Sequence, residues 1–301
     1  MDDPSGTDDR TAKGGTTVLA DLASAPLEST KPSVLALTVL LAILVLPPVV
    51  YIFNDSLHVT APDGFSKIFS VENYHAIFSN PRFYFNLFNS CIYSLGSGIL
   101  AICLGTVQAW IVERTDTPGR KSMYLVAILS LAIPNVLYCV SWLLVFGKSG
   151  PVNDMLRGLF GDDVSVNIYS MTGMIIVEGF AWAPLAFLLL ASTFRNFDAA
   201  LEEVAAMSGA GLTQTFRRIT LRMSTPAVLA LGLLIVVRVF ESFEVPALIG
   251  IPGNVYVIST SIFDSVSLKS PPQYGPASAF SVVLLCIVAA LLQLQSRLSR
   301  S

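Results

Sequence analysis

Charged residues are scarce in this 301-residue chain: Asp, Glu, Lys and Arg make up 13% of it, against 53% hydrophobic residues. Soluble domains carry about 25% charged residues, so the composition excludes an ordinary soluble protein. Cysteine (four) and histidine (two) are also rare, and every cysteine falls inside a long apolar run. We therefore predict no disulfide framework, no metal site and no catalytic residue. A Gly-Lys-Ser/Thr phosphate loop is absent as well, which argues against ATP hydrolysis by the chain itself.

Long apolar runs are what the sequence has in place of charge. A helix needs about 20 such residues to cross a hydrocarbon layer of about 30 Å. Six runs are long enough, namely residues 34–53, 88–112, 122–146, 172–194, 226–249 and 276–296. They do not alternate with a period of two, and lipid tolerates only helices or closed barrels. The sequence thus predicts an all-α polytopic membrane protein with six transmembrane helices.

The distribution of basic residues predicts the orientation of these spans. If the N-terminus is cytoplasmic, the inner segments carry Arg10, Lys13, Lys31, Arg114, Arg120, Lys121, Arg195, Arg217, Arg218, Arg222, Arg297 and Arg300. The outer segments then carry only Lys67, Arg82, Lys148, Arg157 and Lys269. Because Lys and Arg concentrate in cytoplasmic loops, we expect both termini to face the cytoplasm.

The same order of runs divides the chain into expected segments. Residues 1–33 are polar and lack the basic start and apolar run of a secretory signal, so they predict a disordered cytoplasmic tail. Residues 34–85 hold the first span and an extracytoplasmic loop, and residues 86–296 hold the transmembrane core. Residues 297–301 form a short cytoplasmic tail.

A polar hairpin, residues 195–225, interrupts the core between the fourth and fifth runs. Residues 199–207 favour a helix, and the glycines of Ser208-Gly209-Ala210-Gly211 end it. Thr213 can then cap a second helix. This shape suits docking on a soluble partner on the cytoplasmic side. The alternative is a loop that packs only on its own bundle.

The residues of this hairpin resemble the EAA loop of ABC importer membrane subunits. That pattern is Glu-Ala-Ala, three residues, Gly, nine residues and Ile-x-Leu-Pro. The matching residues, which the resemblance makes the candidate ATPase-coupling set, are Glu203, Ala205, Ser208, Gly209, Ala210, Phe216, Ile219 and Leu221. Val204 replaces the first Ala, and Arg222 stands where Pro is expected, which is predicted to let the helix run straighter into the fifth span.

The likeness extends over about residues 70–296. Residues 240–260 resemble the branch of the family that serves ferric iron, with thiamine and polyamine permeases as near relatives. The resemblance implies the type I importer permease fold in a bacterial plasma (inner) membrane. It implies three partners: a cytoplasmic ABC ATPase dimer, a second permease subunit (a copy, a paralogue or the other half of a fused chain), and an extracytoplasmic solute-binding protein. ATP and Mg²⁺ would be used by the ATPase, with no cofactor on this chain, and no nucleic acid is expected.

Four ionisable residues inside the predicted spans are candidates for the solute path, because charges in lipid are costly. They are Glu178, Arg238, Glu241 and Glu244. Arg238 lies about 18 Å from the inner end of its span, and Glu241 is one turn further on, within pairing distance. One interpretation is a buried ion pair that fixes helix packing. The other is a solute path or outer gate whose acids favour a cationic solute.

The predicted function is therefore the permease subunit of an ATP-driven, binding-protein-dependent importer, with ferric iron as the expected solute. The alternative is an ion-gradient-driven secondary transporter or channel. It accounts for the intramembrane charges but leaves the hairpin without a role.

Overall fold

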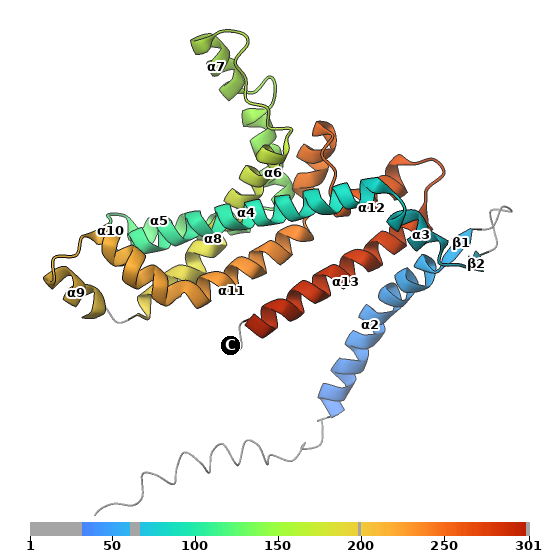
Figure 1. The fold of residues 1–301 in the computed structure, drawn as a ribbon, viewed down its shortest axis with the longest axis horizontal. Helices are drawn as coiled ribbons and strands as arrows, with labels where there is room; N and C mark the ends of the chain where they lie inside the picture. Colours follow the sequence, from blue (N-terminus) through green and yellow to red (C-terminus); the bar gives the residue numbers. More distant parts are fainter. Residues whose placement is uncertain (1–31, 61–66, 198–199, 299–301) are drawn as a thin grey trace, which may run out of the picture. The chain divides into compact units, whose positions relative to one another are not determined.

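The computed structural model describes residues 32–60, 67–197 and 200–298, and Figure 1 shows the helices in chain order. The chain divides into two units, Met1–Tyr51 and Ile52–Ser301. Helix α2 (Pro32–Ser56) supplies the described part of the first unit and continues into the second. The tail predicted over residues 1–33 lies almost entirely outside the described residues.

Helices make up most of the second unit. The long ones are α4 (Pro81–Arg114), α8 (Met171–Arg195), α11 (Leu221–Phe240) and α13 (Tyr274–Leu298). The shorter ones are α3 (Glu72–Phe78), α5 (Arg120–Ala132), α6 (Asn135–Phe146), α7 (Pro151–Phe160), α9 (Ala200–Met207), α10 (Leu212–Thr215) and α12 (Ile258–Phe263). Wider or tighter helical turns are η1 (Phe216–Thr220), η2 (Pro246–Gly250), η3 (Ile251–Gly253) and η4 (Asp264–Leu268). Strands β1 (His58–Thr60) and β2 (Lys67–Phe69) pair antiparallel, a small departure from the all-α prediction.

Five helices are long and apolar enough to cross a membrane. They are Ala36–Ser56, Pro81–Arg114, Met171–Arg195, Thr213–Phe240 and Tyr274–Arg297. Two further pairs of helices qualify together but bend at a short break: Arg120–Ala132 with Asn135–Phe160, by 102°, and Pro246–Gly253 with Ile258–Leu268, by 81°. The described residues thus offer five to seven candidate spans, a range that includes the predicted six.

The predicted third span, residues 122–146, is a broken helix. Helix α5 ends at Ala132, and α6 begins at Asn135. Pro134 lacks an N–H and disfavours helical geometry in the residue before it, and Ile133 is accordingly extended, with ψ at 125°. The span predicted as one helix is therefore two helices meeting at the proline.

The predicted fifth span, residues 226–249, extends too far. Helix α11 ends at Phe240, so Glu244 lies beyond the helix that carries Arg238. In a continuous helix, the N–H of residue 246 would bond the Ser242 carbonyl, but Pro246 has no N–H to donate. The Ser259 hydroxyl donates to that carbonyl instead, at 2.8 Å, and helps to hold the break.

Helix α4 packs against both α8 and α11 in the second unit (Figure 1). Glycines on α4 permit this close approach. A Cβ at Gly105 would overlap Ala186 and the backbone of α8, and one at Gly98 would lie 2.6 Å from a Val236 methyl on α11. Small residues at these positions therefore let α8 and α11 pack closely on α4.

Candidate functional site

The hairpin has the predicted form of two helices joined by a glycine turn. Residues 198 and 199 are not described; α9 follows them and ends at Met207. The second helix begins with α10 at Leu212, and Gln214 and Thr215 both donate their N–H groups to the Gly211 carbonyl at 3.0 Å. Thr213 therefore lies inside the helix and does not cap it. From Leu212 the helix runs through η1 into α11 without a break, as the Arg222 departure predicted (Figure 1).

Gly209 makes the turn between the two hairpin helices. Its φ of +82° lies in the left-handed region, where a side chain is strained. The Ala210 N–H donates to the Ala205 carbonyl at 3.0 Å, and the Ser208 hydroxyl donates to the Val204 carbonyl at 2.8 Å. The first of these is the six-to-one backbone bond of a Schellman motif at the end of α9. A Cβ at Gly209 would meet nothing within 4 Å, so the space beside the turn is open.

Apolar side chains are exposed at the tip of the hairpin. Met207 is 88% exposed, and Val204 is also exposed. Ser208 and Gly209 are exposed beside them, whereas Ala205 and Ala210 are half-buried. For Glu203 the structure describes only the backbone, within α9, so its predicted contact lies outside the described side chains. Met207 and Val204 were absent from the predicted site residues, although their place beside Gly209 was a usable signal.

The other three predicted hairpin residues are half-buried on the second helix. The Phe216 ring lies 4.7 Å, centroid to centroid, from the ring of Trp110 on α4. Ile219 and Leu221 follow on the same continuous helix. Phe216 therefore anchors the second leg of the hairpin on the bundle.

The four intramembrane charges do not form one cluster. Arg238 and Glu241 form the predicted ion pair, at 3.5 Å, but their side chains are 61% and 37% exposed on this chain. Glu178 is buried and accepts a hydrogen bond from the Trp182 indole N–H at 3.0 Å. Glu244 is half-buried. Among the described residues, no ion pair joins Arg238 to Glu178 or Glu244. The contact of Arg238 with Glu241 is thus not a buried pair within this chain.

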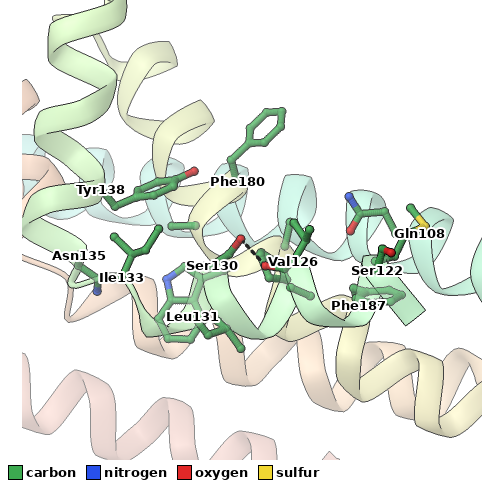
Figure 2. A pocket seen from close by; sticks show the side chains of 16 residues that line it. Gln108, Ser122, Val126, Ser130, Leu131, Ile133, Asn135, Tyr138, Phe180 and Phe187 are labelled. Atoms are coloured by element: carbon green, nitrogen blue, oxygen red, sulfur yellow. Dashed lines mark hydrogen bonds between the residues drawn. The ribbon is translucent and has the colours of Figure 1, made fainter. Parts of the chain in front are cut away.

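A cavity of about 570 Å³ lies against α4, α5, α6 and α8 (Figure 2). Its wall is uncharged and combines aromatic rings with amides and hydroxyls. Its polar and aromatic lining residues include Gln108, Ser122, Asn135, Tyr138, Trp182 and Phe187. None of the four predicted path residues lines this cavity; Glu178 reaches it only through its hydrogen bond to Trp182. Charge did not indicate this wall; its signal in the sequence was Pro134, which separates α5 from α6, and Pro184, which lies inside α8.

An ionic cluster at the base of the hairpin was also missed. The Glu113 side chain, on the last turn of α4, is 1% exposed and forms ion pairs with Arg195 at 3.1 Å and with Arg120. The Tyr124 hydroxyl donates to Glu113 and accepts a hydrogen bond from Arg195 at 2.8 Å. The cluster joins the ends of α4 and α8 to the start of α5. Its signal was Glu113 beside Arg114, directly after an apolar run.

Comparison with known proteins gives both a family match and individual relatives. Residues 101–301 match the family described as binding-protein-dependent transport system inner membrane component. A Haemophilus influenzae protein named as a ferric transport system permease is 25% identical over 210 residues, covering 70% of this chain and 32% of that protein. The trehalose transport system permease protein of Mycobacterium tuberculosis is 25% identical over 193 residues, covering 62% of this chain and 64% of that protein. This chain therefore spans less than two thirds of the length of either relative.

A solved structure shares the fold. It is the bacterial alginate ABC transporter in complex with its alginate pentasaccharide-bound periplasmic protein. One of its chains matches with a TM-score of 0.72 and 18% identity, over 95% of this chain and 96% of that one.

Proposed function

The chain belongs to the family of binding-protein-dependent transport system inner membrane components, and on that premise we propose that it is the permease subunit of an ATP-driven importer. It is a multi-pass protein of the inner membrane. The observation that carries the proposal is the hairpin, which holds exposed apolar side chains at its tip and continues as one helix into a membrane span. An ion-gradient transporter, the alternative function, has no use for such a hairpin.

In this proposal the hairpin tip docks on a cytoplasmic ABC ATPase dimer. Val204 and Met207 enter a groove of the ATPase, and the open space beside Gly209 allows its surface to approach. The helix from Leu212 to Phe240 is about 43 Å long at about 1.5 Å per residue, so a displacement at the tip tilts a whole span. ATP and Mg²⁺ are bound by the ATPase, and this chain binds neither.

The remaining partners follow from the orientation. Arg217, Arg218 and Arg222 on the second leg of the hairpin favour a cytoplasmic position for it. The opposite face then meets an extracytoplasmic solute-binding protein. A second permease subunit, either another copy or a paralogue, completes the translocation path, with the cavity at α5, α6 and α8 as the candidate wall.

The docking proposal is tested by placing a charge at the tip of the hairpin. Burying a Met side chain contributes about 1.5–3 kcal/mol, so Met207→Asp should weaken association with the ATPase at least tenfold. The matched control is Met155→Asp on α7, where the methionine is 58% exposed but lies outside the hairpin. Both variants are purified from cells that express the complete transporter, and the co-purified ATPase is quantified. Equal ATPase recovery in the two variants would refute docking at the tip.

Two solute classes are supported by specific observations. Ferric iron is favoured by the Haemophilus influenzae relative and by the acidic residues Glu241 and Glu244 in the predicted fifth span. A neutral polar solute such as a disaccharide is favoured by the uncharged aromatic and amide wall of the cavity and by the trehalose relative.

Uptake measurements separate the two classes. Cells that lack the gene are complemented with wild type, Trp182→Ala or Glu241→Gln, and uptake of radiolabelled iron, trehalose, thiamine and putrescine is followed. Restored trehalose uptake that Trp182→Ala abolishes would support the neutral solute. Restored iron uptake that Glu241→Gln reduces and Trp182→Ala leaves unchanged would support iron and exclude the neutral class.

A further inference from the structure

Three residues on the last turn of α4 hold both legs of the hairpin. The Trp110 ring contacts the ring of Phe216 on the second leg, with the two planes tilted by 41°. Arg114 donates to the carbonyls of Phe194 and Phe197, at 2.6 and 3.0 Å, where α8 ends and the first leg begins. Glu113 lies between them in sequence. Since residues at i, i+3 and i+4 share one face of a helix, Trp110, Glu113 and Arg114 form a single seat.

Glu113 is the charged centre of this seat. Its carboxylate accepts hydrogen bonds from Arg195 through two nitrogens, Nη2 at 3.1 Å and Nε at 3.4 Å, and it also pairs with Arg120. The guanidinium of Arg195 also lies over the Tyr124 ring, with Cζ 5.5 Å from its centroid. A two-point contact of this kind fixes direction as well as distance. The contact therefore fixes the direction in which the chain leaves α8 and enters the hairpin.

We propose that Glu113 is the positioning residue of the coupling hairpin, holding its first leg against α4 and the start of α5 through Arg195. This inference rests on the proposed function, because positioning matters only if the hairpin transmits motion from an ATPase. The burial of Glu113 makes the role specific. The carboxylate is enclosed by Arg195, Arg120 and Tyr124, so removing its charge removes both ion pairs and weakens the hydrogen bond from Tyr124.

The test measures the spread of hairpin positions relative to the bundle, without any ATPase present. Spin labels are attached at Met207→Cys and at Leu285→Cys, an exposed position on α13, after the four native cysteines are replaced by alanine. The distance distribution between the labels is recorded for the chain in lipid nanodiscs. Glu113→Gln should at least double its width, and Glu113→Asp, which keeps the charge, should restore most of the sharpness.

Two controls separate positioning from a general loss of structure. Arg157→Gln breaks an ion pair with Asp154 on α7 and should leave the hairpin distribution unchanged. A second label pair, Leu189→Cys on α8 with Leu285→Cys, reports on the bundle alone and should stay narrow in Glu113→Gln.

Two results would overturn the proposal. The first is a hairpin distribution in Glu113→Gln as narrow as in wild type. The second is equal broadening of the bundle pair, because Glu113 would then support the fold as a whole. Since no ATPase is present, this outcome is independent of the Met207→Asp recovery experiment. A broadened hairpin together with normal recovery of ATPase from Met207→Asp would reject docking and leave the geometric role of Glu113 intact.

Discussion

The left-handed turn at Gly209 gives a sharp prediction for alanine substitution. At φ +82° an L-residue is strained by about 1–2 kcal/mol, because its Cβ approaches the following carbonyl oxygen. No other atom lies within 4 Å of a Cβ built at this position, so the cost arises from the backbone alone. A bias of 1–2 kcal/mol corresponds to a factor of about 5–30 in the equilibrium between the turn and its alternatives.

Gly209→Ala should therefore weaken association with the ATPase by about 5–30-fold, since only the correctly turned hairpin docks. Gly211→Ala is the matched control. A Cβ there also meets nothing within 4 Å, and Gly211 is not among the positive-φ glycines of the described residues. Alanine restricts the unfolded chain equally at both sites, so that contribution cancels.

The assay is titration of the co-expressed ATPase onto the permease held in nanodiscs. Gly209→Asn should fall between the two alanine variants, because asparagine enters the left-handed region more readily than alanine. If Gly209→Ala and Gly211→Ala bind within twofold of each other, the turn geometry does not limit docking and the reasoning fails.

Two further predictions concern packing. Gly105→Ala should lower the thermal midpoint of the purified chain, because the new Cβ overlaps Ala186 and overpacking costs about 1–3 kcal/mol; Gly232→Ala, whose Cβ would sit 3.6 Å from its nearest neighbour, should leave the midpoint unchanged or raise it. Equal midpoints would contradict the close approach of α4 and α8. Phe216→Ala should cost about 0.5–1.5 kcal/mol through loss of the ring pair with Trp110 and should weaken ATPase association in the same titration, whereas Phe216→Tyr should not.

Much of the fold follows from residue patterns that act locally. Length and hydropathy place the long helices, and the glycines of the second run predict the tight packing of α4. What failed was the extent of single helices. The fifth span is predicted to reach residue 249 because the apolar run continues that far. Pro246 nevertheless removes the N–H that the Ser242 carbonyl would need in a continuous helix. The replacement donor is Ser259, seventeen residues away, which no local pattern can supply.

The candidate site divides in the same way. The glycine turn could be predicted because the left-handed conformation is a property of one residue and its neighbours. The seat on α4 could not, because Glu113 and Arg195 lie 82 positions apart and meet only after α4 and α8 have packed. The cavity was missed for a different reason. Its wall is uncharged, whereas the prediction of path residues rests on the cost of burying charge in lipid.

Helix α4 therefore serves two purposes at different points along its length, and perturbations should separate them. Gly98 and Gly105 lie in its middle and allow close packing of α11 and α8, respectively. Substitutions there therefore act on the stability of the whole bundle. Trp110, Glu113 and Arg114 form its last turn and hold the hairpin, so substitutions there act on the direction of the hairpin. If all parts of α4 contributed alike to stability and to the placement of the hairpin, both groups of variants would lower the thermal midpoint and broaden the hairpin distances together. The contacts instead require that Gly105→Ala lowers the thermal midpoint. Glu113→Gln should broaden the hairpin distances while the distances within the bundle stay unchanged.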